Sequence, residues 1–361
     1  MRFWLLLSLL LVACSHRDRG GLYRFDGDGR LLGGKKFETL WTDDDLPPHR
    51  IQIPVNLTTA LVAHERIRQR RSPKKPELEA VIKRLVTWSK TPGNRPLPRD
   101  FRGQRLAGFD GFGNVQFTGY YSPVIEAARQ RSEAYPYPLY RHPPEWDPKG
   151  TYLTRQQIDE DGGLEGRGLE IAWTADRMSN FFLHVQGSGY VQFKDGERIL
   201  LAYGGKNGHQ YTSIGRLLVE RGAISKSEIS MQAIKAWAQK HPEQVSELLY
   251  QCESYTFFRT GPVGPIGAGG EVVVSHLSVA VDPKVIPLGA VLLAKVPQLN
   301  ADGHLTGHGW RILLAQDKGA AIKGPGHIDL YLGVGDEAGR RAGRLHHYGS
   351  VWMLRGPLPS Q

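Results

Sequence analysis

The chain has 361 residues, of which 40% are hydrophobic, so it is long enough for two domains with sizeable cores. Its 43 glycines and 23 prolines favour short strands and turns and argue against a helical bundle. A formal net charge of +10 suits a nucleic acid, an anionic membrane surface or an acidic polymer as partner.

The N-terminus predicts export. Arg2 precedes an apolar run from Phe3 to Ala13, which is shorter than the roughly 20 residues that cross a bilayer and is typical of a signal-peptide core. Leu11-Val-Ala-Cys14 followed by Ser15 resembles a bacterial lipoprotein cleavage site. We therefore expect a signal peptide at residues 1–13 and an outer membrane lipoprotein that faces the periplasm, anchored by several acyl chains on Cys14.

Residues 14–54 are polar and broken by glycine and proline, which predicts a lipidated N-terminus, a linker and irregular structure. Two helices should follow. Asn56 can cap a helix through about Arg70, and Pro76 suits the first turn of the next helix. The basic residues 66–75 have no aromatic residues between them, so we do not expect nucleic-acid binding.

The segment Val115–Tyr121 reads VQFTGYY and predicts a strand whose side chains could contact a ligand. Thr118 offers a hydroxyl group, while Tyr120 and Tyr121 offer flat apolar faces with polar tips. An ordinary strand with packed tyrosines fits this segment equally well. Residues 122–146 are rich in proline and arginine, and we interpret them as the crossing into a second domain.

Within this second domain, residues 151–203 predict short strands that alternate with glycine turns. The segment His184-Val-Gln-Gly-Ser-Gly189 carries Gln186 and Ser188, which can hydrogen-bond a polar ligand, although a glycine-serine turn alone is a weak signal.

Helices are predicted further along the second domain. Ser213 can cap a helix that Gly222 ends, and Ser225-Lys-Ser-Glu228 fits a capping box. More helices are expected around residues 234–237 and 245–249. Cys252 is interpreted as a packing residue and not a nucleophile.

A glycine- and proline-rich segment at residues 261–270 predicts the return to the first domain. The strands expected after it are Val272–Val281, Val291–Val296, Trp310–Gln316, His327–Leu332 and Val351–Leu354.

The stretch from Ala315 to Gly335, AQDKGAAIKGPGHIDLYLGVG, combines two acidic residues with two turn-prone segments. Asp317 would cap the strand that precedes it. The run from His327 to Leu332 alternates strictly, so its apolar residues would face a core, and His327, Asp329 and Tyr331 would face a cleft. A carboxyl group held on a strand between an imidazole and a phenol suits acid/base chemistry. An ordinary half-exposed strand would show the same alternation.

Several stretches, in this order along the chain, resemble the membrane-bound lytic murein transglycosylase A family. They are GNVQFTGYYSPV, HVQGSGYVQF, YGGKNGHQYTSIGRLL, SVAVDPKVIPLG, AQDKGAAIKGPGHIDLYLG and EAGRRAGRLHHYGSVW. The resemblance implies a mainly β fold with some helices. A double-psi β-barrel domain would comprise residues 55–121 and 259–356, a smaller β-rich domain would be inserted at residues 122–258, and a groove would lie between them.

The same resemblance implies the activity and the site. The enzyme would cut the β-1,4 bond between N-acetylmuramic acid and N-acetylglucosamine in peptidoglycan glycan strands, leaving 1,6-anhydro ends. The three aspartates of the family match Asp282, Asp317 and Asp329. Asp329 would act as acid and then as base, while Asp317 and Asp282 would orient the site. The residues expected to contact substrate are Thr118, Tyr120, Tyr121, Gln186, Ser188 and Asp282.

No metal and no organic cofactor is implied, and a link to the cell-wall synthesis machinery stays open. Two alternatives to this function also stay open: a hydrolase that uses Asp317 and Asp329 as a water-activating pair, and a wall-binding lipoprotein without activity. Gly333-Val-Gly335 followed by Gly339 does not have the spacing of a dinucleotide fingerprint. His304 and His308 are better explained by a surface hairpin than by a zinc site.

Overall fold

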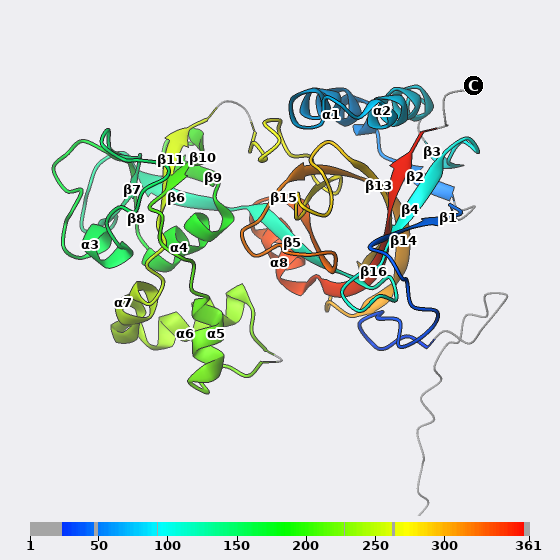
Figure 1. The fold of residues 1–361 in the computed structure, drawn as a ribbon. Coiled ribbons are helices and arrows are strands. Elements are labelled where there is room, and N and C mark those ends of the chain that lie inside the picture. The colour runs from blue at the N-terminus through cyan, green and yellow to red at the C-terminus, as the bar shows by residue number, and fades with distance from the viewer. Residues whose placement is uncertain (1–23, 47–49, 92, 227, 262–263, 357–361) are drawn as a thin grey trace, which may run out of the picture.

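The computed structural model describes residues 24–46, 50–91, 93–226, 228–261 and 264–356 and has two β-rich lobes (Figure 1). The predicted signal peptide and Cys14 lie outside the described residues. Within the described ranges, no helix combines the length and apolar character needed to cross a membrane.

The first lobe is a closed β-barrel, as expected. Its strands follow the order β16-β13-β14-β12-β15-β5, and β5 pairs back onto β16. Strands β12 and β14 are parallel, as are β15 and β5, and the other neighbours in the ring are antiparallel. Closure leaves these strands without a free edge. Their bounds are β5 Val115–Ser122, β12 Ser278–Ala280, β13 Val291–Leu299, β14 Leu305–Asp317, β15 His327–Val334 and β16 His346–Arg355.

Elements from the N-terminal part extend and cover this barrel. Strands β4 (Arg102–Leu106) and β1 (Trp41–Asp44) add to the sheet beyond β16, and β2 (Arg50–Ile53) pairs with β3 (Gly93–Pro96). Helices α1 (Leu57–Arg71) and α2 (Pro76–Ser89) pack together and lie across the barrel (Figure 1), where their apolar faces share a buried cluster with β13, β14 and β16. Both helices begin where the sequence predicted.

The inserted lobe has a sheet of its own, in the order β11-β10-β9-β6-β8-β7, with helices at one side (Figure 1). Its first strand follows β5 almost directly, so the chain passes from barrel to insert within one extended segment. The strands are β6 Val124–Ala128, β7 Tyr137–Tyr140, β8 Glu170–Thr174, β9 Gly189–Phe193, β10 Arg198–Lys206 and β11 Thr256–Thr260. The helices are α3 Arg155–Asp159, α4 Arg177–Gln186, α5 Ile214–Glu220, α6 Met231–Lys240 and α7 Pro242–Tyr250.

The prediction of strands and turns alone at residues 151–203 was wrong, because α3 and α4 lie there. Asp176 caps α4 by accepting hydrogen bonds from the backbone N–H groups of Met178 and Ser179, and Gly187 ends it in the left-handed conformation at φ +77°. The start and stop signals of α4 are therefore present in the sequence.

Three other local predictions were also wrong. No helix starts at Ser225, whose hydroxyl bonds the Glu228 side chain, and Ser230 caps α6 instead. In the segment predicted as a strand at residues 272–281, only Ser278–Ala280 forms one. Two short strands, β1 and β2, lie in residues 14–54, where only irregular structure was expected, because four-residue strands give little periodic signal.

Helix α8 (Asp336–Arg344) was missed as well, because its sequence is mostly charged or small. Its small buried residues let it lie directly against β5. A Cβ atom added to Gly119 would come within 2.8 Å of the Ala342 Cα atom, and one added to Gly339 would come within 2.8 Å of the Tyr121 ring. The small residues therefore fix the distance between α8 and the strand that carries Thr118.

Candidate active site

The barrel places the predicted acidic residues side by side in one row of its sheet. Ala280 pairs with Asp317 on one side and with Asp329 on the other, and Asp329 in turn pairs with Thr118. Neighbouring strands lie about 4.8 Å apart, so the Cα atoms of the two aspartates are separated by roughly two strand spacings. Three segments that are distant in sequence thus supply one site.

Asp329 has the environment of a general acid. The pKa of its carboxyl group is raised from 3.8 to about 7, chiefly by burial and also by the negative charge of Asp317, while a hydrogen bond from Thr118 opposes both. The Thr118 hydroxyl donates to Asp329 Oδ1 over 2.7 Å. This bond leaves Oδ2 as the oxygen that can carry a transferable proton.

Asp317 ends β14, as predicted, and both of its carboxyl oxygens already accept hydrogen bonds. Oδ1 accepts from the backbone N–H groups of Ala268 and Lys318, each over 2.8 Å, and Oδ2 accepts from the Tyr120 hydroxyl over 3.1 Å. Burial nevertheless raises the pKa of Asp317 above its ordinary value, and these three bonds oppose that shift. No pattern in the sequence predicts the contact with Ala268, because Ala268 lies in the glycine-rich return segment.

Asp282 follows β12 by two residues, and its carboxylate accepts hydrogen bonds from backbone N–H groups. Its Oδ1 accepts from the Lys284 N–H over 3.0 Å, and its Oδ2 accepts from the Gly324 N–H over 2.9 Å. These two backbone bonds, the Gly324 bond first, hold the pKa of Asp282 below its usual value. Asp282 therefore fixes the loop between β14 and β15 and stays ionised.

Aromatic and hydroxyl side chains complete this row. His327 Nε2 lies 2.8 Å from the Thr118 hydroxyl, which already donates to Asp329, so the imidazole nitrogen acts as the donor to Thr118. The rings of Tyr120 and Tyr331 lie 5.1 Å apart. Tyr331 is buried and shares a 3.0 Å hydrogen bond with the Ser122 hydroxyl. The prediction that Tyr331 faces a cleft was therefore wrong, because neighbouring side chains cover that face.

The insert brings Gln186 and Ser188 to the junction of the two lobes. Gln186 ends α4, and its Oε1 accepts a hydrogen bond from the backbone N–H of Tyr121 over 3.3 Å. Tyr121 is buried, and its hydroxyl donates to the Met231 sulfur over 3.2 Å. This placement favours a role for Tyr121 in joining the lobes over direct contact with a ligand.

Tyr203 is an aromatic residue near this junction that the sequence analysis did not single out. Its side chain lies 3.8 Å from the position that a Cβ atom on Gly187 would occupy, and it is half exposed. A register shift in the pairing of β10 with β11 occurs next to it, and such irregularities re-aim side chains. An isolated tyrosine before two glycines was the only signal in the sequence.

The insert also contains an apolar cavity of about 460 Å³, which the helices α4, α5 and α6 surround. Its lining includes Phe182, Val185, Tyr211 and Met231. The three aspartates do not line it. The acidic residues therefore belong to the barrel, and the cavity is a separate feature of the insert.

Comparison with known proteins shows which family this chain resembles. One family model, the MltA specific insert domain, matches residues 116–259, and another, the 3D domain, matches residues 277–355. Membrane-bound lytic murein transglycosylase A of Escherichia coli K12 is 38% identical over 354 residues, which cover 96% of this chain and 93% of that protein. The protein of the same description from Vibrio cholerae is 41% identical over 254 residues, covering 69% of this chain and 68% of that protein.

Solved structures give the same result. The crystal structure of E. coli MltA with bound chitohexaose superposes with a TM-score of 0.80 at 36% identity, covering 92% of this chain and 99% of that chain. A membrane-bound lytic murein transglycosylase from Agrobacterium tumefaciens superposes with a TM-score of 0.71 at 30% identity, covering 84% of this chain and 93% of that chain.

The opposing effects on Asp329 can be separated by titration. Asp317→Asn removes the negative charge that raises the pKa of Asp329, so the pKa should fall below about 7. Thr118→Val removes the hydrogen bond that stabilises the carboxylate, so the pKa should rise. The measurement is the pH dependence of the Asp329 carboxyl ¹³C shift by NMR. Shifts in the same direction in both variants would contradict the arrangement described above.

Proposed function

The chain belongs to the membrane-bound lytic murein transglycosylase A family, and from this premise we propose how its site cleaves peptidoglycan. The protein is an enzyme, a peptidoglycan lytic transglycosylase, which excludes the alternative of an inactive wall-binding lipoprotein. The proposed reaction breaks the β-1,4 bond between N-acetylmuramic acid and N-acetylglucosamine without water and forms 1,6-anhydromuramic acid.

Asp329 performs both proton transfers in this proposal. With a pKa of about 7, a large fraction of the carboxyl groups are protonated near neutral pH, and the acid can donate to the departing glycosidic oxygen. The C6 hydroxyl of the same muramic acid then attacks C1. The Asp329 carboxylate accepts the C6 proton, which returns the enzyme to its starting state.

A single acid suffices because the nucleophile is part of the substrate. Hydrolytic glycosidases need a second carboxylate to activate water or to attack the sugar. A tethered hydroxyl group has a large effective molarity and needs no separate activation of water.

The bonding of Asp317 is the observation that carries this choice. Two backbone N–H groups and the Tyr120 hydroxyl occupy both of its oxygens. A carboxylate engaged in these bonds is less free to take a proton from water, and its charge raises the pKa of Asp329. We therefore assign Asp317 the role of a field-setting residue, and Asp282 that of a residue that positions the neighbouring loop.

The glycan would lie in a groove between barrel and insert, with residues of both lobes in contact with it. On the barrel side, Thr118 orients Asp329 and Tyr120 orients Asp317. On the insert side, Gln186 is the last residue of α4, and Ser188 lies two residues further along the chain. Both side chains can hydrogen-bond sugar hydroxyl and acetamido groups. Tyr203 adds an exposed aromatic face beside them.

We also propose that the enzyme is held at the outer membrane, facing the periplasm. The support is the Leu11–Cys14 segment and the description of the E. coli relative as membrane-bound. The net charge of +10 suits an anionic wall and anionic lipid head groups. Contacts with the wall-synthesis machinery stay an open part of this proposal.

The products decide between a single acid and a carboxylate pair. Digestion of purified murein sacculi should give muropeptides that are one water lighter than hydrolysis products and carry no heavy oxygen from labelled water. Asp329→Ala should abolish turnover while the protein stays folded, and Asp302→Ala, in an exposed turn, should retain activity. Incorporation of heavy oxygen at reducing ends in the wild-type digest would support the paired-carboxylate hydrolase instead.

The insert contact has a separate test. In an Asp329→Ala background, which prevents turnover, Gln186→Ala should weaken binding of chitohexaose by about 1–3 kcal/mol, because a hydrogen-bond partner is lost. Calorimetric titration measures the change, with Gln156→Ala on an exposed face of α3 as the matched control. Equal affinities for the two variants would place Gln186 outside the glycan site.

The membrane anchor is tested by Cys14→Ala. This change removes the only proposed acylation site, so the protein should lose fatty-acid labelling and leave the outer membrane fraction. Retention of both properties would show that another feature anchors the chain.

A further inference from the structure

A second cluster of chemically reactive side chains lies on the barrel, outside the acidic row. The segment around Asp28 folds back on itself, with Phe25 bridging Leu31, and its tip docks on β16. The Tyr348 N–H donates to the Asp28 carbonyl oxygen over 2.8 Å. At Gly29, with φ +82°, a Cβ atom would lie 3.0 Å from the Tyr348 carbonyl oxygen and 3.2 Å from the His308 ring. The tip is therefore held tightly against the barrel.

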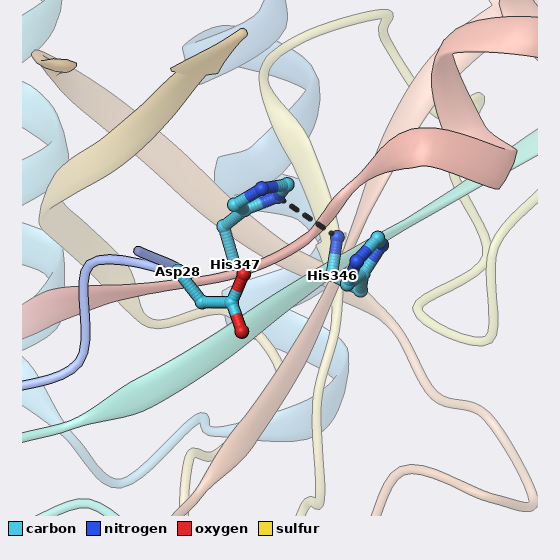
Figure 2. Close-up of side chains that lie close together, drawn as sticks. All are labelled: Asp28, His346 and His347. Carbon is cyan, nitrogen blue, oxygen red and sulfur yellow. Dashed lines mark hydrogen bonds between the residues drawn. The ribbon is translucent and has the colours of Figure 1, made fainter. Parts of the chain in front are cut away.

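Two consecutive histidines at the start of β16 meet this tip. Figure 2 shows the side chains of Asp28, His346 and His347 gathered at one place, although Asp28 is separated from the histidines by most of the chain. The two imidazole rings have centroids 4.8 Å apart. One carboxylate oxygen and one nitrogen from each ring all lie within 4.8 Å of one another. No other group of three such residues that could hold a metal ion occurs in the described part of the chain.

His347 is the buried member of this cluster. Its Nδ1 accepts a long hydrogen bond of 3.4 Å from the His346 N–H, and a metal ion bound at this nitrogen would replace that bond.

The other two side chains are exposed and lie at the surface of the described structure. The hydrogen bonds of Asp28 within the described residues run through its backbone N–H and carbonyl groups, and the carboxylate is exposed. The His346 side chain is exposed too, and its hydrogen bond to His347 uses the backbone N–H. Both side chains can rotate toward a shared ion.

We propose that Asp28, His346 and His347 bind one divalent transition-metal ion of the zinc class, with water completing its coordination. Two imidazoles and a carboxylate match the borderline-soft preference of zinc, whereas magnesium and calcium prefer oxygen ligands alone. Ligands of one zinc ion lie roughly 3.3 Å apart at Zn–N distances of about 2.0–2.1 Å, so the two exposed side chains must close by only about 1–2 Å.

Such an ion would link the N-terminal segment around Asp28 to β16, which pairs with the strand that carries Thr118. His346 pairs with Thr118 across β16 and β5, and Thr118 is the residue that bonds Asp329. The ion would stabilise the folded state because the unfolded chain does not hold the three ligands together. This role does not depend on the proposed reaction, since none of the three ligands takes part in it.

Zinc titration of the full chain, extracted in detergent and first stripped of metal with a chelator, tests the proposal. Calorimetry should show saturable binding of one zinc ion per chain, and zinc should raise the thermal unfolding temperature. Magnesium should do neither. Asp28→Asn and His346→Gln should each weaken zinc binding by at least about tenfold. His241→Gln, at a partly exposed histidine of the insert, should bind zinc like the wild type.

The unfolding temperature measured without metal shows whether each variant is folded, so a loss of binding can be assigned to a lost ligand. Absence of saturable binding in the wild type would overturn the proposal. Unchanged zinc affinity in both ligand variants would overturn the proposal as well. So would a loss of affinity in His304→Gln without a loss in Asp28→Asn, because the zinc would then be bound by other histidines.

Discussion

The burial of the Asp329 carboxyl group sets the chemistry of the candidate site. β15 lies between β12 and β5 in the barrel, so Asp329 has a strand on each side, and the pairing of β5 with β16 closes the ring. Burial is the main cause that raises its pKa to about 7. An exposed strand at the edge of an open sheet would leave the same residue solvated and ionised.

Close packing of small residues maintains this burial. Gly119 follows Thr118 on β5 and lies so close to α8 that a side chain there would collide with Ala342 or Leu332. If β5 moved outward, the Thr118 hydroxyl would move away from Asp329 and water would enter between them. By allowing β5 to lie close to α8, the small residues of α8 help to keep Asp329 buried and its pKa raised, although they do not contact Asp329.

The sequence predicted the parts of the site that depend on local pattern. Alternation placed Ile328 and Leu330 in the core and Asp329 opposite them, and the polar step after residue 316 ended β14 at Asp317. Alternation assigns a face but does not tell what covers it, which is why Tyr331 was expected in a cleft and lies buried. The family resemblance supplied the barrel, which the strand pattern alone did not specify.

Contacts between distant segments could not be predicted in this way. The hydrogen bond from the Ala268 N–H to Asp317 joins a glycine-rich return segment to the end of a strand. No residue pattern in either segment indicates that the two are in contact. The approach of Asp28 to His346 likewise depends on how the N-terminal segment crosses the closed barrel. Their distances follow from the tertiary fold, so no periodic signal along the chain reports them.

The same burial that makes Asp329 an acid also links stability to pH. Its pKa in the folded chain lies above the ordinary value of 3.8, so the folded state holds this proton more tightly than the unfolded state does. The resulting contribution to stability is fully present below about pH 4 and is lost as the pH rises through about 7. Ionisation costs the free energy of placing a charge in a buried site beside Asp317, whose pKa burial also raises. Relative to an exposed aspartate, the fold thus favours the protonated form, which would donate to the glycosidic oxygen in the proposed reaction. The same raised pKa makes the resulting carboxylate a stronger base than an exposed one, which suits it to accept the proton of the C6 hydroxyl.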